Sequence, residues 1–413
     1  MPKATTTSYP KDKIKVLLLE GISPSAVKEF EQAGYSNIVT NGKALGEAEL
    51  VDAIQDVHIL GIRSKTQVSR KALQSAEKLL GLGCFCIGTN QVDLKAATQL
   101  GITVFNSPYS NTRSVAELVI ANAIMLIRRI PEKNSGAHLG EWLKDSKGCY
   151  EVRGKTLGIV GYGHIGSQVS VLAESLGLKV IYYDIEPKLP LGNAMPVKSL
   201  GDLLKKADIV TLHVPGGKGT ENLLSAARIK GMKKGAILIN LSRGNVVDLD
   251  ALQTALLAGD IAGAGIDVFP IEPEGKGEKF SSPLQGLPNV ILTPHVGGST
   301  EEAQVNIGID VAGKLVSLLD TGSTMGSVSV PPLSLPVQQG THRLLHIHKN
   351  VPGILSQINS IMGSMGVNIL GQYLKTNEEI GYVVLDVAKN SASDEVLREL
   401  RSIQHTIKAR VLY

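Results

Sequence analysis

Short, mainly apolar runs alternate with helix-like stretches through the first hundred residues. Residues 14–19, 59–62, 79–87 and 102–105 predict strands, and residues 25–33 predict a helix. Such alternation implies a parallel sheet with helices packed on its faces. We therefore expect a small α/β unit at the start of the chain.

The same alternation resumes after a long apolar helix, predicted at residues 114–126. Ser114-Val115-Ala116-Glu117 has the spacing of a capping box that would open this helix. The helix is more apolar than one buried face requires, which indicates a domain or subunit interface. Later apolar runs predict six strands, at residues 157–160, 179–183, 209–214, 236–240, 262–268 and 290–293, and helices at 167–176, 200–205, 248–258 and 301–319. This order is typical of a doubly wound parallel sheet.

The end of the chain has a different composition. Residues 322–340 are rich in Ser, Pro, Gly, Thr and Gln, which predicts a linker. The remaining residues predict strands at 343–348, 368–374, 381–387 and 406–411 and helices at 351–363 and 393–401. Their βαββαβ order is the ferredoxin-like split motif, so we expect a separate small domain here.

Composition limits the class of protein. The 413 residues are 43% hydrophobic, enough for two or three domains with real cores. The net charge of +4 is spread without a long basic block, which argues against a nucleic-acid-binding or membrane-binding surface. Cys84, Cys86 and Cys149 lack metal-ligand spacing, so we expect buried free thiols rather than a redox pair, and no metal site. We find no secretory segment or run of about 20 apolar residues, and we expect a cytoplasmic protein.

A glycine-rich turn carries the clearest chemistry. Gly161-Tyr162-Gly163-His164-Ile165-Gly166 lies between a predicted strand and a predicted helix, and Asp184 ends the next strand, 18 residues after Gly166. This is the pattern of a dinucleotide site, in which the acid accepts hydrogen bonds from ribose hydroxyls. Because a carboxylate repels a 2′-phosphate, the pattern favours NAD over NADP.

Three charged or titratable residues follow successive predicted strands. Arg243, Glu272 and His295 would lie at the carboxyl edge of the sheet, where ligands of open α/β sheets bind. His295 can take a hydroxyl proton, Glu272 can orient its imidazole, and Arg243 can grip a carboxylate. His295 alone could equally be structural. The three together predict oxidation of a 2-hydroxy acid.

The motifs together resemble the D-isomer-specific 2-hydroxyacid dehydrogenase family. They are the glycine turn, Ser242-Arg243-Gly244, residues 267–273 and residues 293–298. Residues 83–94 and 105–118 are similar to the short bacterial branch that oxidises D-3-phosphoglycerate, and the C-terminal tail resembles its ACT regulatory domain. The resemblance implies a Rossmann-type NAD domain inserted in a flavodoxin-like α/β substrate domain, followed by a ferredoxin-like ACT domain. The expected segments are 1–110 (substrate-binding), 111–300 (NAD-binding), 301–338 (substrate-binding return segment and linker) and 339–413 (ACT).

The resemblance also implies roles for individual residues. Arg243, Glu272 and His295 would form the catalytic set. The residues that would bind NAD are Gly161, Gly163, His164, Ile165, Gly166, Asp184, Ser242, Arg243, Asp267, His295 and Gly298. Arg63, Lys65 and Asn111 would bind the substrate, with Lys144 reaching the site of a neighbouring subunit. His348, Asn350 and Asn368 would hold the inhibitor serine between ACT domains of a homotetramer. The implied reaction is the first step of serine biosynthesis, with 2-oxoglutarate reduction as a possible second activity.

Two departures from the family pattern affect these expectations. Lys65 stands where an arginine is common, which replaces a bidentate grip by a point charge. Gln339-Gly340 stands where the family has a Gly-Gly hinge before the ACT domain, and this affects how strongly serine would act. His348 and Asn350 could instead cap the helix that follows. The alternative functions are a dehydrogenase for an unphosphorylated D-2-hydroxy acid and a non-catalytic protein that senses NAD or serine.

Overall fold

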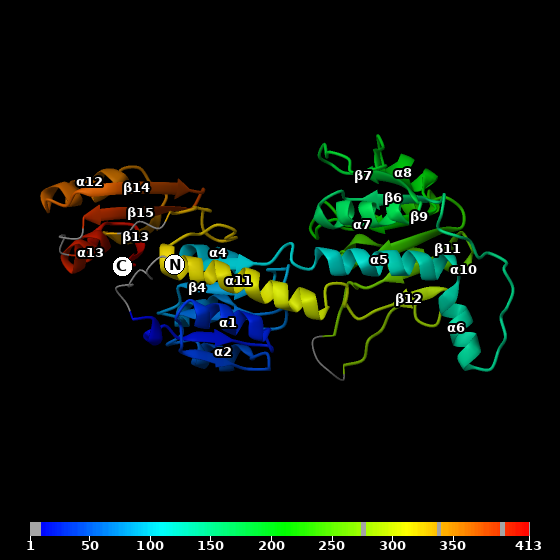
Figure 1. Cartoon of the computed structure of the whole chain (residues 1–413), viewed down its shortest axis with the longest axis horizontal. Coiled ribbons are helices and arrows are strands. Elements are labelled where there is room, and N and C mark those ends of the chain that lie inside the picture. The colour runs from blue at the N-terminus through cyan, green and yellow to red at the C-terminus, as the bar shows by residue number, and fades with distance from the viewer. Residues whose placement is uncertain (1–9, 274–277, 337–339, 389–392, 413) are drawn as a thin grey trace. The chain divides into compact units, whose positions relative to one another are not determined.

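A computed structural model describes residues 10–273, 278–336, 340–388 and 393–412. The chain forms two compact units, each of which is described by itself. Unit 1 comprises Met1–Ser110 and Gln304–Tyr413, and unit 2 comprises Asn111–Ala303 (Figure 1). Unit 1 thus draws on both ends of the chain, and unit 2 is the segment inserted between them.

Unit 1 contains a five-stranded parallel sheet with the order β2-β1-β3-β4-β5. Its strands are β1 (Val16–Leu18), β2 (Ile38–Thr40), β3 (Ile59–Ile62), β4 (Gly81–Cys84) and β5 (Thr103–Asn106). The order 2-1-3-4-5 is that of flavodoxin-like folds, as expected. β2 was not predicted, because it is a three-residue edge strand without a longer apolar run.

Helices cover both faces of this sheet. They are α1 (Pro24–Gln32), α2 (Glu47–Ala53), α3 (Arg70–Ser75), α4 (Leu94–Gln99) and α11 (Glu301–Thr321), preceded by the short 3-10 helix η1 (Lys11–Lys13). Phe30 of α1 and Val311 of α11 belong to one core, and Leu50 of α2 belongs to the core on the other face. Gly83 of β4 allows α11 to lie close to the sheet, because a Cβ there would lie 2.6 Å from Val311 Cγ1.

The segment predicted as a linker packs against unit 1 over its described part, residues 322–336. Ser327 forms an isolated antiparallel β-bridge with Phe105, and Val328 N–H donates to Val104 O at 2.9 Å. Ser329 is buried, and its hydroxyl accepts from Val104 N–H at 2.8 Å. The linker prediction is therefore wrong here. Segments of this composition are usually flexible, but hydrogen bonds hold this one against unit 1. Gln339 of the expected hinge lies outside the described residues.

The C-terminal part of unit 1 holds a four-stranded antiparallel sheet with the order β14-β15-β13-β16. Its elements are β13 (Thr341–Lys349), α12 (Ile354–Ser364), β14 (Ile369–Thr376), β15 (Ile380–Ala388), α13 (Ser393–Ser402) and β16 (Thr406–Val411). This confirms the predicted βαββαβ order. One face packs on α12 and α13, and the other contacts Val330 and Leu335. Arg343 and Asp386 form a fully buried ion pair in this sheet, at 2.6 Å.

Unit 2 is built on a seven-stranded parallel sheet with the order β12-β11-β10-β9-β6-β7-β8. The strands are β6 (Thr156–Val160), β7 (Lys179–Tyr183), β8 (Met195–Pro196), β9 (Ile209–Leu212), β10 (Ala236–Asn240), β11 (Ile261–Ile266) and β12 (Val290–Leu292). Six of them were predicted. The two-residue strand β8 was missed because both of its residues are exposed and form no apolar run.

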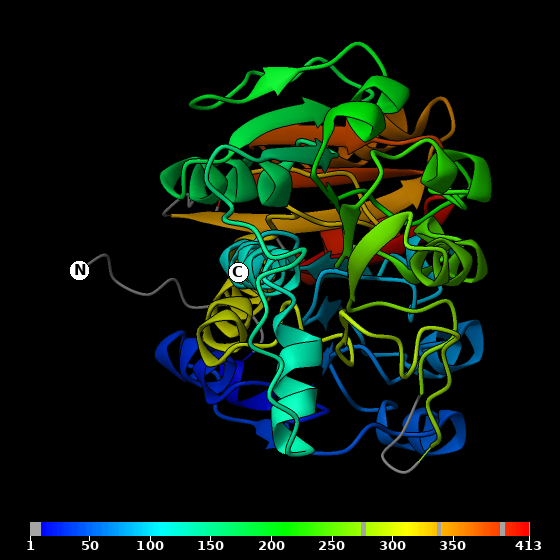
Figure 2. The same cartoon turned by 90° about the vertical axis from the view of Figure 1, so that its right-hand side faces the viewer.

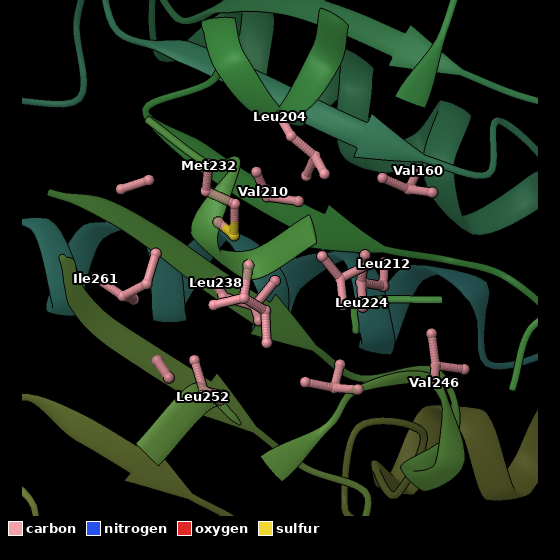
Figure 3. Close-up of a cluster of buried hydrophobic side chains, with 14 of the residues drawn as sticks. Val160, Leu204, Val210, Leu212, Leu224, Met232, Leu238, Val246, Leu252 and Ile261 are labelled. Atoms are coloured by element: carbon pink, nitrogen blue, oxygen red, sulfur yellow. The ribbon is translucent and has the colours of Figure 1, made fainter. Parts of the chain in front are cut away.

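Helices pack on both faces of the unit-2 sheet. They are α5 (Thr112–Ile127), α6 (Ile130–His138), α7 (His164–Ser175), α8 (Leu200–Lys206), α9 (Ala226–Lys230) and α10 (Leu249–Leu257), with the 3-10 helix η2 (Gly244–Val246). α5 and α7 lie side by side on one face (Figure 1). On the other face Leu204, Leu238 and Leu252 contribute to an aliphatic core (Figure 3). This core includes residues of β10 and β11, the strands that the candidate-site residues Arg243 and Asp267 follow.

The start of α5 differs from the capping-box prediction. The helix begins at Thr112 after Asn111, so Ser114 lies inside its first turn. The Ser114 hydroxyl is bonded to Thr300 Oγ1 at 2.8 Å, and Glu117 pairs with Arg113 at 2.6 Å. The prediction was wrong because both side chains have other partners. α6, which was not predicted, projects from unit 2 with the loop that follows it (Figure 1 and Figure 2).

Within the described ranges, no helix is long and apolar enough to cross a membrane. In the same ranges, no three His, Cys, Asp or Glu side chains are grouped as metal ligands. The three cysteines are free thiols, as predicted, but only Cys84 is buried, whereas Cys86 and Cys149 are partly exposed.

Candidate active site

The three glycines of the turn between β6 and α7 have different surroundings. Gly161 has φ +91°, and a Cβ there would lie 2.3 Å from His213 O. A Cβ on Gly166 would lie 2.2 Å from Gly161 O, whereas a Cβ on Gly163 would meet no atom within 4 Å. Gly161 and Gly166 are therefore required by the turn itself. Gly163 leaves open space at the start of α7, where a helix N-terminus can receive a phosphate.

Asp184 lies directly after β7 beside the same turn. Its carboxylate accepts from Tyr162 N–H at 2.7 Å and from Glu186 N–H at 3.0 Å. These two backbone donors fix the carboxylate at the strand end. The geometry fits a group that accepts hydrogen bonds from ribose hydroxyls.

Asp267, after β11, organises the turn that carries His295. Its buried carboxylate accepts from Thr293 Oγ1 at 2.5 Å, from Val296 N–H at 2.9 Å and from Gly297 N–H at 2.8 Å. His295 has φ +54°, a left-handed conformation that is uncommon for residues other than glycine. Its own N–H donates to Asp267 O at 2.8 Å. Asp267 therefore fixes a strained backbone that would otherwise relax.

His295 and Glu272 form a close pair, with Nδ1 and Oε2 at 2.8 Å. The hydrogen bond to Glu272 raises the pKa of His295 against the opposing effect of partial burial. Burial raises the pKa of Glu272, but hydrogen bonds from His295 and from Phe269 N–H, the latter at 3.0 Å, lower it overall. Both shifts favour a charged pair. A carboxylate that stabilises an imidazolium in this way supports a histidine that takes up a proton during the reaction.

Arg243 follows β10, and its charge helps to lower the pKa of Glu272 and offsets a small part of the rise in the pKa of His295. The guanidinium donates to Ser242 O at 2.7 Å, and Asn240 Nδ2 donates to Arg243 O at 3.0 Å. Ser242 in turn donates to Asn240 Oδ1 at 2.8 Å. Asn240 thus orients both residues of the Ser-Arg pair. Neither Asn240 nor Thr293 was predicted, since sequence alone gives no signal for such supporting contacts.

The structure brings Arg243, Glu272, His295 and Asp267 together in unit 2. Arg63 and Lys65 belong to unit 1, where they follow β3. Arg63 O accepts from Gln91 Nε2 at 2.6 Å. Lys65 is exposed. A strand exit with two cations is suited to binding an anion.

Two other expected substrate residues lie in unit 2. Asn111 is buried, and its Oδ1 has no hydrogen-bond partner among the described residues. A Cβ on Gly298 would lie 2.1 Å from Asn111 Nδ2, so the glycine leaves room for this side chain. Lys144 is in an exposed segment beside Trp142, whose side chain is 82% exposed.

Comparison with known proteins agrees with this arrangement. Residues 120–297 match the model of the D-isomer specific 2-hydroxyacid dehydrogenase NAD binding domain. The chain is 56% identical to D-3-phosphoglycerate dehydrogenase of Haemophilus influenzae, over 98% of this chain and 99% of that protein. It is 52% identical to the protein of the same name from Escherichia coli strain K12, again over 98% and 99%.

The chain belongs to the D-isomer-specific 2-hydroxyacid dehydrogenases. A crystal structure of such a family member from Lactobacillus delbrueckii ssp. bulgaricus, in its NAD complexed form, is also similar. Its TM-score is 0.64 at 29% identity, over 74% of this chain and 96% of that one. Membership of this family makes NAD the cofactor, and the open space at Gly163 and the fixed carboxylate of Asp184 fit that group.

The C-terminal sheet of the present chain matches a second family model, that of the AHAS small subunit-like ACT domain, over residues 344–408. His348 is buried in β13, and its Nε2 finds no hydrogen-bond partner among the residues that the structure describes. Asn350 Nδ2 donates to Asn377 O at 2.7 Å, and Asn368 is exposed just before β14. α12 begins at Ile354 after Gly353, so the alternative of Asn350 as its cap is wrong.

Proposed function

We propose that this dehydrogenase oxidises D-3-phosphoglycerate to 3-phosphohydroxypyruvate with NAD, the first step of L-serine biosynthesis. The observation that carries the proposal is the His295–Glu272 pair next to Arg243, in a chain about half identical to D-3-phosphoglycerate dehydrogenases over nearly its whole length. A base, its orienting carboxylate and a fixed cation are what this reaction requires.

His295 would accept the C2 hydroxyl proton at Nε2, because Nδ1 is engaged by Glu272. Glu272 stabilises the imidazolium that forms, and Arg243 holds the substrate carboxylate. Bound at this site, NAD would supply the acceptor for the hydride of C2. The turn at Gly161–Gly166, Asp184, Ser242, Asp267 and Gly298 would hold the cofactor, as the close contacts of these residues support.

Arg63 and Lys65 would bind the substrate phosphate and carboxylate, with Asn111 and Lys144 as further contacts. We also propose that segments 1–110 and 301–338 bind substrate, 111–300 binds NAD and 339–413 regulates. Regulation would be inhibition by serine at His348, Asn350 and Asn368 in a cytoplasmic homotetramer. Two findings support a small polar ligand in this region: the ACT match, and the buried Nε2 of His348, which has no hydrogen-bond partner within the described part of the chain.

The test is NADH consumption by the full chain with 3-phosphohydroxypyruvate. The wild type should turn over, and His295→Asn should lose activity by a factor of about 10²–10⁴ while NADH binding stays intact. His405→Asn is the matched control, because His405 is also an exposed histidine with positive φ. Equal turnover by His295→Asn and wild type would refute the assignment.

The substrate class is tested in the same assay. Hydroxypyruvate lacks the phosphate, and a higher kcat/KM with it would favour an unphosphorylated acid as the natural substrate. 2-Oxoglutarate, which also carries an anion far from its keto acid, would be measured as a second substrate. No turnover with any keto acid, together with tight NADH binding, would favour the sensing protein.

A further inference from the structure

Glu20 has an unusual position beside the loop that carries Arg63 and Lys65. It follows β1, is half-buried, and has φ +60°. Glutamate rarely adopts this left-handed conformation, which is strained unless surrounding contacts enforce it. The next residue, Gly21, also has positive φ, so two consecutive residues turn the chain here.

The side chain of Glu20 explains why the conformation is kept. One carboxylate oxygen accepts from Lys65 N–H at 3.0 Å and the other from Thr66 N–H at 2.9 Å. The backbone carbonyl of Glu20 also accepts from Arg63 Nη1 at 3.5 Å. A single residue therefore contacts three groups of the segment Arg63–Thr66.

The same loop is held from its other side. Gln91 is nearly buried and donates to Arg63 O at 2.6 Å, and the Thr66 hydroxyl accepts from Leu45 N–H at 3.4 Å. Thr66 itself is fully buried. Together with these contacts, Glu20 fixes the backbone of Lys65 and leaves the Lys65 side chain exposed.

The arrangement has a consequence for anion binding. Two successive backbone N–H groups in a turn are themselves good donors to a phosphate or carboxylate. Here both N–H groups already donate to Glu20, so neither is available to an incoming anion, and the side chains of Arg63 and Lys65 would bind it instead. The Glu20 carboxylate fixes the backbone from which those side chains extend, and it does not itself bind the substrate.

We propose that Glu20 is a positioning residue for substrate binding, which holds the Arg63–Thr66 loop in its substrate-binding shape. The inference rests on the proposed function, because Arg63 and Lys65 have their substrate role only there. Glu20 touches neither substrate nor cofactor in this proposal, so its loss should affect KM far more than kcat.

The experiment compares Glu20→Gly, Glu20→Gln and Glu49→Gln with wild type, using 3-phosphohydroxypyruvate and NADH. Glu20→Gly removes the carboxylate but suits the positive φ, so backbone strain is separated from the lost hydrogen bonds. We expect its KM to rise about tenfold or more, as loss of two charge-assisted hydrogen bonds at a half-buried site implies. Its kcat should stay within about twofold, and its NADH affinity should be unchanged.

Glu20→Gln retains one acceptor oxygen, so its KM should lie between those of wild type and Glu20→Gly. Glu49→Gln is the matched control, because Glu49 also accepts from a backbone N–H, that of Gly46 at 3.0 Å, in the same unit. Its KM should equal that of wild type.

The outcomes separate the two proposals. Turnover by wild type with an unchanged KM in Glu20→Gly would overturn the role of Glu20 alone. A fall of kcat in parallel with Tm in both Glu20 variants, at constant KM, would mean a purely structural residue and would overturn it as well. No turnover by wild type would overturn the proposed function and this inference with it.

Discussion

The two kinds of glycine in the β6–α7 turn predict two different mutant phenotypes. In Gly166→Ala the new Cβ would lie 2.2 Å from Gly161 O, whereas real Cβ contacts are essentially never under 3.0 Å. The turn must open by the difference of 0.8 Å or more. Overpacking of this kind costs about 1–3 kcal/mol. If binding must restore the original turn, NADH affinity falls by about 5- to 150-fold, since about 1.4 kcal/mol is a factor of ten.

Gly163→Ala is the matched comparison. Gly163 has φ −83°, which alanine adopts readily, and its Cβ would meet nothing within 4 Å. The variant without cofactor should therefore unfold at the wild-type Tm. NADH binding should still weaken, because a methyl group would fill the space that the cofactor phosphates approach.

The assays are thermal unfolding without cofactor and fluorescence titration with NADH. Gly166→Ala should lower both Tm and affinity, and Gly163→Ala should lower affinity alone. The reasoning is refuted if Gly163→Ala lowers Tm as much as Gly166→Ala does, or if Gly166→Ala binds NADH like wild type.

Three further predictions follow from the site and the ACT sheet. Glu272→Gln removes the hydrogen bond that raises the pKa of His295. Reduction of the keto acid needs protonated His295 and declines as pH rises through that pKa, so the declining limb of kcat/KM should move to lower pH in the variant. A limb that does not move would exclude Glu272 as the partner of His295. Asp184→Ser removes the charge that opposes a 2′-phosphate, so kcat/KM with NADPH should rise relative to NADH; a constant ratio would place the selectivity elsewhere. Asp386→Asn leaves the fully buried Arg343 without its counter-charge and should cost about 3–5 kcal/mol in urea unfolding, whereas the double variant Arg343→Met, Asp386→Leu should cost clearly less. Equal costs in the single and double variants would mean that an unpaired charge is not the cause.

The fold could be predicted from the sequence where apolar runs are long and alternate regularly. The strands β3, β7, β10 and β16 have the bounds that were expected. Apolar periodicity fails where an element buries little: β2 and β8 are short edge strands, and α6 carries only Gly136 as a buried residue. It also cannot foresee tertiary contacts, which is why residues 322–336 looked like a linker.

For the site, the residue types could be predicted from the sequence, but the geometry that holds them could not. Arg243, Glu272 and His295 could be selected because parallel strands end at one edge, and the structure brings them together. The residues that hold them could not be selected. Asp267 was expected as an NAD contact, and its three hydrogen bonds to the His295 turn depend on a left-handed backbone that no local pattern encodes. The roles themselves stay predictions until the variants are measured.

The packed segment 322–336 limits how the regulatory part of the chain can be exchanged. Val330 and Leu335 complete the core on the open face of the ACT sheet, and Ser327 bridges Phe105 of β5. A fusion that starts at residue 339 would therefore expose Ile347 and Tyr382 to water, because Val330 and Leu335, which pack against them, would be left behind. An ACT domain that keeps this core therefore has to include Val330 and Leu335, so chimaeras that exchange ACT domains between dehydrogenases should be joined within or before the end of α11.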